Sequence, residues 1–384
     1  MGEVGARAPV EGTASRPVPP VTTRTARFAA ASPWALSRLD LSHGVGEVYD
    51  NATRALTVRM EEKTMIDGMQ IGFNLPISGG MADPAAMARV AREGEALGFD
   101  YLTLTDHVAI PDMRAPGYPY SESGEFYGAS PGHRHEQLVA TSWIAAKTER
   151  IRLVLAVMVV PHRPAVLAAK MLASIDVLSG GRLVVGVGAG WLAAEFASVV
   201  TTPFAERGAV TDAYLDAFRT LWTEARPRLD GPYVKMDGLV FDPKPVQKPY
   251  PPIWVGGESG PSMRRAARLA DAWYPIGSNR AHLLDSLPRL EAGIARLRRL
   301  VREAGRDPAT MGVVYRVKRH AIPMPPASDG NRRLFSGSIS DVIEDVRVLR
   351  GIGVTGLDFD FEQDDADGVI AGMRRFRDEV MGRV

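Results

Sequence analysis

The feature that most constrains the fold is a regular alternation of short apolar runs and amphipathic helical stretches from Met69 onward. Eight runs have the length and composition of buried strands, at residues 69–75, 100–106, 150–160, 182–188, 252–257, 271–277, 311–322 and 354–361. Helical stretches follow them, at 83–99, 135–148, 164–179, 203–224, 261–270, 280–304, 338–353 and in the final segment. Such alternation indicates parallel strands covered by helices on their faces. Eight repeats predict an α/β fold of the (β/α)₈ TIM-barrel type, with a doubly wound open sheet as the alternative.

Residues 1–68 differ from the rest of the chain. They are rich in Ala, Arg, Pro, Thr and Ser, and before Asp40 their only acids are Glu3 and Glu11. Such a stretch buries little apolar surface, so we expect a disordered extension or a translation start placed too early. The predicted organisation is therefore an extension at 1–68 and a barrel domain at 69–384.

Composition excludes several classes of function. The chain contains no cysteine, which rules out disulfides, thiolate metal sites and a cysteine nucleophile, and makes a reducing cytoplasm the simplest expectation. A net charge of +1 favours neither nucleic acid nor an anionic membrane as a partner. No uncharged apolar stretch reaches the ~18 residues that a membrane span requires.

The run "LVVGVGAGWLAAEF", residues 183–196, raises the question of a dinucleotide fingerprint because it holds Gly186, Gly188 and Gly190. That fingerprint needs a third glycine three residues after the second, where this chain has Trp191. It also belongs to the first strand of its domain, whereas this run follows three strand-and-helix units. The glycines therefore fit the end of the fourth barrel strand better.

A barrel places function at the carboxyl ends of its strands. These ends fall at Asn74, Asp106–His107, Val160–His162, Gly188–Trp191, Gly256–Gly260, Pro275–Gly277, near His320 and at Asp360. A histidine such as His107 can donate a hydrogen bond or a proton to a ligand in the barrel mouth. The alternative is that His107 only packs beside an aspartate that caps a loop.

The loop Gly256–Gly260 stands between a strand and a helix and is a candidate phosphate site. Its glycines allow backbone N–H groups to face an anion, and the helix N-terminus adds partial positive charge. Glu258 opposes an anion contact through its own side chain, and an ordinary glycine-rich turn is the alternative. After the third strand, Arg163 precedes Pro164, which suits the start of a helix.

The stretch "HRHE", residues 133–136, suggests a metal site. It follows a Gly/Pro/Ser-rich loop, and no carboxylate–histidine set surrounds it at ligand spacing, so no metal is predicted.

Taken together, these segments resemble the luciferase-like monooxygenase superfamily, and most closely its deazaflavin (coenzyme F420) dependent oxidoreductases. The resemblance rests on "IGFNLP", "EALGFDYLTLTDHV", "VLAVMVVPHRPAVLAAKMLASIDVLSGGRLVVGVGAGW", "EF", "PFAERG", "DPKPVQKPYPPIWVGGES" and "RRAARLADAWYP". It extends from Met69 to near the end of the chain. Residues 1–68 have no counterpart in the family pattern.

The resemblance implies a barrel mouth that holds a deazaflavin or flavin, with His107 as the catalytic residue near the reactive ring. It implies a non-proline cis peptide at Ala156–Val157, behind the ring. The implied cofactor-binding residues are Asn74, Asp106, His107, Ala156, Val157, Gly188, Gly190, Trp191, Gly256, Gly257, Glu258, Ser259 and Gly260. Trp191 stands where some dehydrogenases of the family carry a glutamate, so a sugar-phosphate dehydrogenase is not expected.

The function that the resemblance implies is hydride transfer between F420 and a small organic substrate, with cofactor chemistry supplied by the ring. The alternatives are an FMN monooxygenase that uses oxygen, a metal-dependent barrel hydrolase built on His107, His133 and His135, and a barrel that binds a cofactor without turnover. The substrate pocket is expected from two loops, 108–134, which carries Tyr118, Tyr120, Phe126 and Tyr127, and 226–252. Family resemblance also implies a homodimer.

Overall fold

The computed structural model describes residues 68–110, 117–121, 124, 134–361, 363 and 365–384. The predicted extension, residues 1–68, lies outside the described residues except for Gly68. Parts of the loop 108–134 also lie outside them, among them Phe126, Tyr127 and His133.

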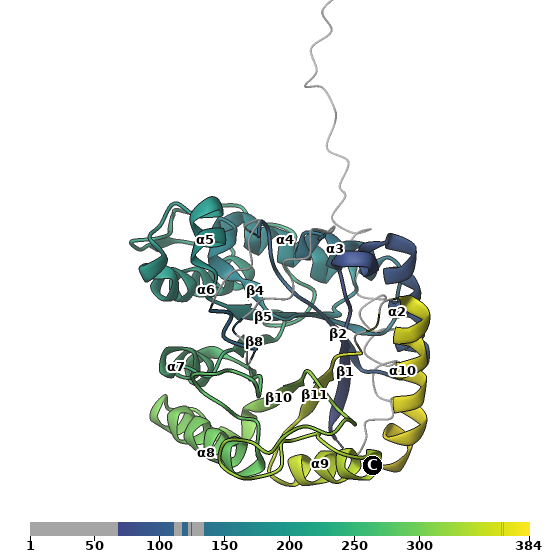
Figure 1. Cartoon of the computed structure of the whole chain (residues 1–384). Coiled ribbons are helices and arrows are strands. Elements are labelled where there is room, and N and C mark those ends of the chain that lie inside the picture. The colour runs from purple at the N-terminus through teal and green to yellow at the C-terminus, as the bar shows by residue number, and fades with distance from the viewer. Residues whose placement is uncertain (1–67, 111–116, 122–123, 125–133, 362, 364) are drawn as a thin grey trace, which may run out of the picture. The chain divides into compact units, whose positions relative to one another are not determined.

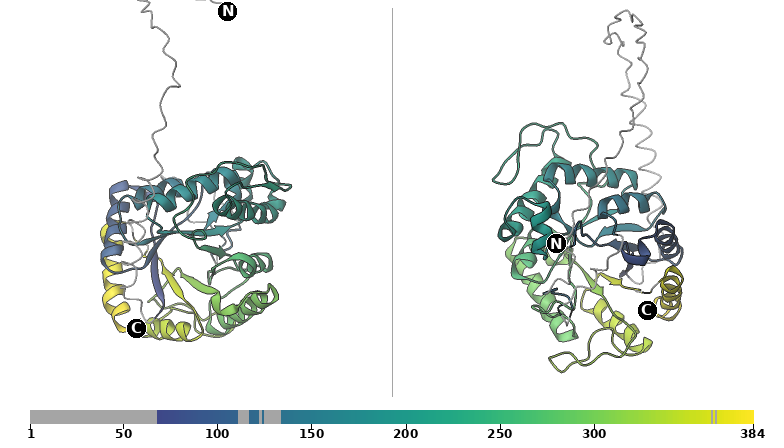
Figure 2. Two further views of the ribbon diagram at one scale, coloured as in Figure 1. Left: turned by 180° about the vertical axis from the view of Figure 1, so that it is seen from behind. Right: turned by 45° about the horizontal axis from the view of Figure 1, so that its top comes forward.

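The strands form a closed parallel barrel, which confirms the predicted fold and excludes the open sheet (Figures 1 and 2). Its strands are β1 (Gln70–Asn74), β2 (Tyr101–Leu104), β3 (Arg152–Leu155), β4 (Met158–Val159), β5 (Leu183–Gly188), β8 (Ile253–Gly256), β9 (Ala272–Tyr274), β10 (Gly312–Val317) and β11 (Gly356–Phe359). The last strand pairs with the first, in the register Gln70 with Gly356, and this pairing closes the ring. Strands β3 and β4 together fill the third of eight positions, since both pair with β5.

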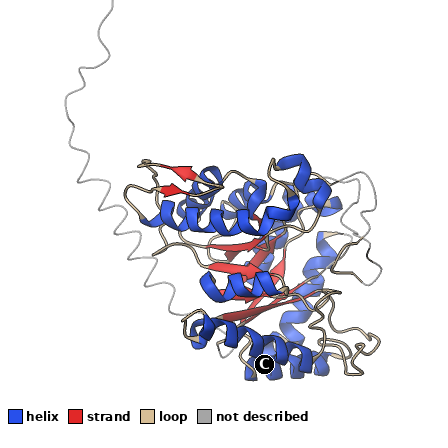
Figure 3. Ribbon diagram, turned by 90° about the vertical axis from the view of Figure 1, so that its left-hand side faces the viewer, coloured by secondary structure: helices blue, strands red, loops and turns tan. Residues whose placement is uncertain are grey.

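Helices surround the barrel, as Figure 3 shows with helices in blue and strands in red. They are α2 (Pro84–Ala96), α3 (Gln137–Ala145), α4 (Ala165–Leu178), α5 (Ala193–Val199), α6 (Arg207–Thr223), α7 (Gly260–Leu269), α8 (Leu287–Glu303), α9 (Ile339–Gly351) and α10 (Ala366–Glu379). Helices α2 and α10 lie side by side, joined by a hydrogen bond of 3.0 Å from Arg374 Nη2 to Glu93 Oε2 (Figure 1). None of the described helices combines the length and the apolar character needed to cross a bilayer.

Local sequence signals explain where helices begin. The side chain of Asp83 accepts a hydrogen bond from Ala86 N at 2.8 Å and caps α2, with Pro84 in the first turn. Helix α8 begins at Leu287 rather than at residue 280, because Pro288 disfavours helical geometry in the residues before it and suits a first turn.

Three elements differ from the predicted ranges. The third strand is divided into β3 and β4, and the seventh, predicted to run to residue 322, ends at Val317. The excursion 226–252 contains an antiparallel hairpin of β6 (Leu229–Asp230) and β7 (Lys235–Met236), which forms no pairs with the barrel sheet (Figure 3). The break in the third strand depends on pairing with the distant β5, and the hairpin on pairing between its own two short strands; periodicity reports neither.

The barrel interior is filled by side chains rather than left as a channel. The aromatic rings of Tyr101, Trp254 and Tyr274 are buried there. Tyr101 lies against Gly72, where a Cβ atom would come within 2.1 Å of the ring, so this position on β1 requires glycine. The filled interior means that a ligand can reach only the open rims of the barrel.

Candidate active site

The predicted site residues share one rim of the barrel. All barrel strands run parallel, so their carboxyl ends lie on the same side. The rim carries the predicted residues that follow β1, β2, β3, β5 and β8, namely Asn74, Asp106, His107, Ala156, Val157, Gly188, Gly190, Trp191, Gly256, Gly257, Glu258, Ser259 and Gly260.

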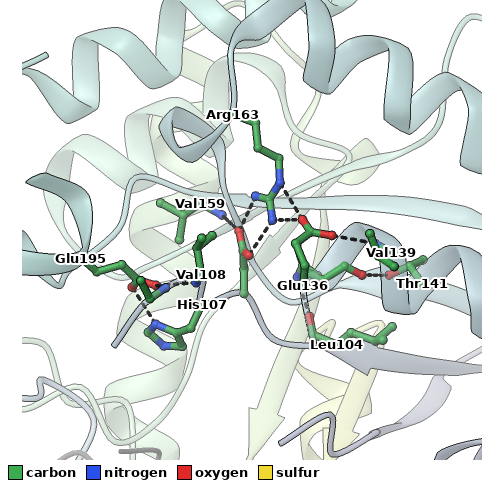
Figure 4. A network of polar contacts seen from close by, with 12 residues as sticks. Leu104, His107, Val108, Glu136, Val139, Thr141, Val159, Arg163 and Glu195 are labelled. Carbon is green, nitrogen blue, oxygen red and sulfur yellow. Dashed lines mark hydrogen bonds and ion pairs between the residues drawn. The ribbon is translucent and has the colours of Figure 1, made fainter. Parts of the chain in front are cut away.

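Asp106 is held by an ion pair with Arg163. Figure 4 labels Arg163 together with Val159 and Glu136, which belong to the same polar network. Nη1 and Nη2 of Arg163 donate to the two carboxylate oxygens of Asp106 at 2.8 and 2.9 Å. The amide of Val159 donates to the same carboxylate at 2.9 Å. The buried Asp106 therefore joins the end of β2 to β4 and the segment after it, and its predicted contact with a cofactor stays a prediction.

Glu136 completes this ion-pair cluster. It contacts both Nε and Nη2 of Arg163, and its other oxygen accepts from Val139 N at 2.7 Å as the N-cap of α3. Burial alone would lower the pKa of the Arg163 guanidinium, but Asp106 and Glu136 raise it overall. The "HRHE" stretch thus supplies a helix cap and an ion-pair partner through Glu136.

His107 is bound to a buried carboxylate that the sequence did not single out, Glu195 on α5. Nδ1 of His107 lies 2.7 Å from Oε2 of Glu195, and the Glu195 side chain is only 2% exposed. The other oxygen, Oε1, accepts from Val108 N at 2.6 Å and Ala109 N at 3.2 Å (Figure 4). Burial would raise the pKa of Glu195, but the hydrogen bonds and the neighbouring His107 lower it overall.

This arrangement assigns the tautomer of His107. An ionised carboxylate can only accept hydrogen bonds, so Nδ1 of His107 must carry a proton. Proton exchange with a ligand would then involve Nε2 of the ring. A fixed tautomer and a nearby negative charge are what a general acid or base of this type requires.

The glycines at the end of β5 make room for the side chain of Val157. A Cβ on Gly188 would lie 2.6 Å from Val157 Cγ2, and one on Gly256 would lie 2.8 Å from Val157 Cγ1. Gly190 has a φ of +85°, which favours glycine. The Ala156–Val157 peptide is cis, as the resemblance implied. These glycines are therefore needed because the side chain of Val157 packs against the backbone at the rim of the barrel. They do not form a dinucleotide fingerprint.

The loop before α7 combines a helix N-terminus with two guanidinium groups. Ser259 caps α7, and Gly257 has a φ of +98°. A Cβ on Gly260 would lie 3.2 Å from Arg264 Nη1 and 3.4 Å from Arg296 Nη2. Neither guanidinium forms an ion pair with a carboxylate of the described residues. This combination suits a phosphate and adds two residues to the predicted site.

Glu258 is turned into the protein. Its carboxyl accepts from Ile276 N at 2.8 Å and contacts Asn279 Nδ2, and the residue is 3% exposed. Burial raises its pKa to about 7. Its side chain thus ties the loop after β8 to the loop after β9, and its predicted contact with a cofactor remains untested.

Beneath the rim, Asn74 belongs to a buried polar network. Its Nδ2 donates to Thr103 Oγ1 at 3.2 Å, and Thr103 donates to Asp358 Oδ2 at 3.2 Å. Asp358 also accepts from Arg316 Nη1 at 2.8 Å and from the hydroxyl of Tyr274. Burial raises the pKa of Asp358 to about 6 although Arg316 opposes this rise. The network forms a polar floor under the mouth of the barrel.

Aromatic rings line the rim between His107 and the loop after β2. The Trp191 ring lies edge-on to His107, with centroids 6.2 Å apart, and edge-on to Tyr118, with centroids 5.1 Å apart. Trp191 therefore lies next to the candidate catalytic histidine, and its predicted contact with a cofactor stays a prediction.

The metal alternative lacks a ligand set in the described part of the chain. No group of three His, Asp or Glu side chains there could hold an ion. His107 is bound to Glu195, Nε2 of His135 lies 2.7 Å from Ala82 O, and His133 lies outside the described residues.

The residues that sequence reasoning missed are charged side chains that come close to the predicted site residues only when the chain folds. They are Glu195, Glu136, Arg264 and Arg296. Two signals in the sequence point to Glu195: it is a lone acid in an otherwise apolar run, four residues after Trp191, and it belongs to the "EF" pair on which the resemblance partly rests.

Comparisons with known proteins identify the family of the chain. Residues 68–324 match the family model described as luciferase-like monooxygenase. An uncharacterised protein of Mycobacterium tuberculosis is 33% identical over 281 residues, covering 71% of this chain and 89% of that protein. An FMNH2-dependent dimethylsulfone monooxygenase of Pseudomonas putida is 33% identical over 156 residues, covering 40% of this chain and 42% of that protein.

Among solved structures, an F420-dependent secondary alcohol dehydrogenase in complex with an F420–acetone adduct has the same fold. It aligns with a TM-score of 0.64 and 15% identity, covering 82% of this chain and 99% of that one. Proteins of this fold thus include enzymes with either cofactor, one named for F420 and one for FMNH2. On the family match, the chain belongs to the luciferase-like monooxygenase family and is an oxidoreductase.

Proposed function

We propose that the protein is an F420-dependent oxidoreductase that transfers a hydride between the deazaflavin and a small organic substrate. The observation that carries the proposal is the His107–Glu195 pair at the rim of the barrel. Hydride transfer to a carbonyl, or from an alcohol, also moves a proton, and this pair places a proton donor or acceptor with a fixed tautomer at the mouth.

The residues present fit such a cofactor. The N-terminus of α7, with Arg264 and Arg296 beside Gly260, offers donors and positive charge for a phosphate. The partly buried side chain of Val157, which lies close against Gly188 and Gly256, offers an apolar surface against which a flat ring can pack. When bound, the deazaflavin supplies the hydride chemistry.

The role of the protein is then to hold a proton at a defined atom. Glu195 is ionised and keeps the proton of His107 on Nδ1. When Nε2 takes up a proton from a substrate hydroxyl, the imidazolium that forms is stabilised by the carboxylate of Glu195. In the reverse direction Nε2 donates that proton to a carbonyl oxygen.

A second candidate is an FMN-dependent monooxygenase that uses oxygen. It is favoured by the identity with the dimethylsulfone monooxygenase, which covers 40% of this chain. The phosphate loop described above would serve FMN as well as F420.

The test is a binding titration of the purified protein with F420 and, separately, with FMN, followed by ring fluorescence. Micromolar or tighter binding of F420, with FMN at least about tenfold weaker, supports the proposal. The opposite preference supports the oxygen-using candidate. Binding of neither cofactor refutes both.

A further inference from the structure

The described part of the loop after β2, residues 117–121, crosses the mouth of the barrel. It follows the second strand position, yet Arg280 N donates to Pro119 O at 2.8 Å and Ser278 Oγ donates to Tyr120 O at 3.1 Å. Arg280 and Ser278 follow β9, the sixth strand position, which lies opposite the second in the closed ring. The segment is therefore tied to the far side of the rim.

Lys318 stands next to this segment and continues an inward-facing row. Side chains alternate along a strand, and Val314 and Arg316 of β10 both face the barrel interior. Lys318 is two residues closer to the mouth. Its Nζ lies 3.4 Å from the hydroxyl of Tyr118 and 5.4 Å from the centre of that ring. The half-buried ammonium therefore lies in the mouth, above the polar floor.

The charge of Lys318 has no counter-charge among the residues that the structure describes. Arg163 at the rim and Arg316 in the polar floor beneath it each form ion pairs with two carboxylates. Lys318 forms no ion pair with any described carboxylate. An ammonium has three N–H donors, and the hydroxyl of Tyr118 can accept only one of them. A partly buried cation with unused donors favours an anionic ligand.

We propose that Lys318 binds the anionic group of the substrate, so that the enzyme acts on small organic carboxylates or sulfonates. The apolar part of the substrate packs against the rings of Tyr118 and Trp191, which lead toward His107. This inference rests on the proposed function, because it places the reacting carbon near His107. Carboxylate or phosphate groups of a cofactor share this chemistry, and the experiment separates the two sources.

The test uses two matched pairs of probes, benzoate with benzamide and benzenesulfonate with benzenesulfonamide. Their binding to the cofactor-loaded protein is measured by calorimetry. We expect each anion to bind at least about tenfold more tightly than its neutral partner. The preference should vanish in Lys318→Met and persist in Lys318→Arg. Lys235→Met, on the exposed hairpin where Lys235 pairs with Asp230, is the matched control and should keep it.

Several outcomes overturn the inference. Equal binding of anion and neutral partner by the wild type refutes it, and so does the absence of anion binding. A tenfold loss of cofactor affinity in Lys318→Met assigns the lysine to an anionic group of the cofactor instead. If the wild type binds neither F420 nor FMN, the proposed function fails, while the preference for anions is still measured in the cofactor-free protein.

Discussion

Replacing Glu195 by glutamine removes the charge that holds His107 while keeping the volume of the side chain. The glutamine oxygen can still accept from the amides of Val108 and Ala109, as Oε1 does in the wild type at 2.6 and 3.2 Å. The new amide nitrogen then faces Nδ1 of His107 and can only donate to it. We therefore expect the ring proton of His107 to move from Nδ1 to Nε2.

The size of the expected effect on kcat and on the free energy of unfolding follows from the loss of the hydrogen bond between His107 and Glu195. A hydrogen bond to a charged group contributes about 1.5–3 kcal/mol to stability. If the same interaction stabilises the imidazolium during turnover, its loss lowers kcat by a factor of about 10 to 150. The free energy of unfolding should fall by a similar ~1.5–3 kcal/mol.

The assay is ¹⁵N NMR of the histidine rings, which reports the tautomer without a substrate, together with urea unfolding. The signal of His107 is assigned by its loss in His107→Ala. Asp176→Asn is the matched control, because Asp176 is a buried carboxylate that accepts from Gln247 N at 3.0 Å near the opposite end of the barrel. It should lower stability without changing the His107 tautomer. An unchanged tautomer in Glu195→Gln, or wild-type kcat, would refute the reasoning.

Three further substitutions test other parts of the site. Asp106→Asn should lower the free energy of unfolding by about 3 kcal/mol in a urea titration, because it leaves the buried guanidinium of Arg163 with one carboxylate fewer; a loss under about 1 kcal/mol would contradict the central role of this ion pair. Glu258 has its pKa raised to about 7, so the folded protein binds its proton before the unfolded chain does as the pH falls. The free energy of unfolding of the wild type, minus that of Glu258→Gln, should therefore rise by up to about 3 kcal/mol as the pH falls from 8 to 4. A difference that does not change with pH would refute the raised pKa of Glu258. Arg296→Ala should weaken the binding of FMN about tenfold more than the binding of riboflavin, which lacks the phosphate. Equal weakening of both would show that Arg296 does not contact the phosphate.

Much of the fold could be predicted because its signals are local. The cap at Asp83 and the proline at position 84 lie within one helical turn of the element that they start. The ends of the strands can be located in the same way. The sequence therefore identifies His107 and Gly256 as rim residues without information on their neighbours in space. The break between β3 and β4 was not predicted, because both pieces are apolar and only their pairing with β5 separates them.

The chemistry of the rim could be predicted only in part. His107 was identified from its position after a strand, but its partner Glu195 is 88 residues away. Asp106 and Arg163 are 57 residues apart, and the sequence suggested no more for Arg163 than its place before a helix. The pairing of Arg264 with Arg296 around Gly260 likewise joins two helices.

The eight strand-and-helix repeats, the rim where the strands end and the position of His107 on that rim can all be read from the sequence. These follow from side-chain periodicity, caps and turn residues, which act over a few positions of the chain. The folded chain is needed to see which carboxylate pairs with His107 or Arg163, and which cations at the mouth have no ion-pair partner among the described residues. Such contacts depend on the register of strands and the rotation of helices when the barrel closes, and a change of one residue in register would point each side chain to the other face.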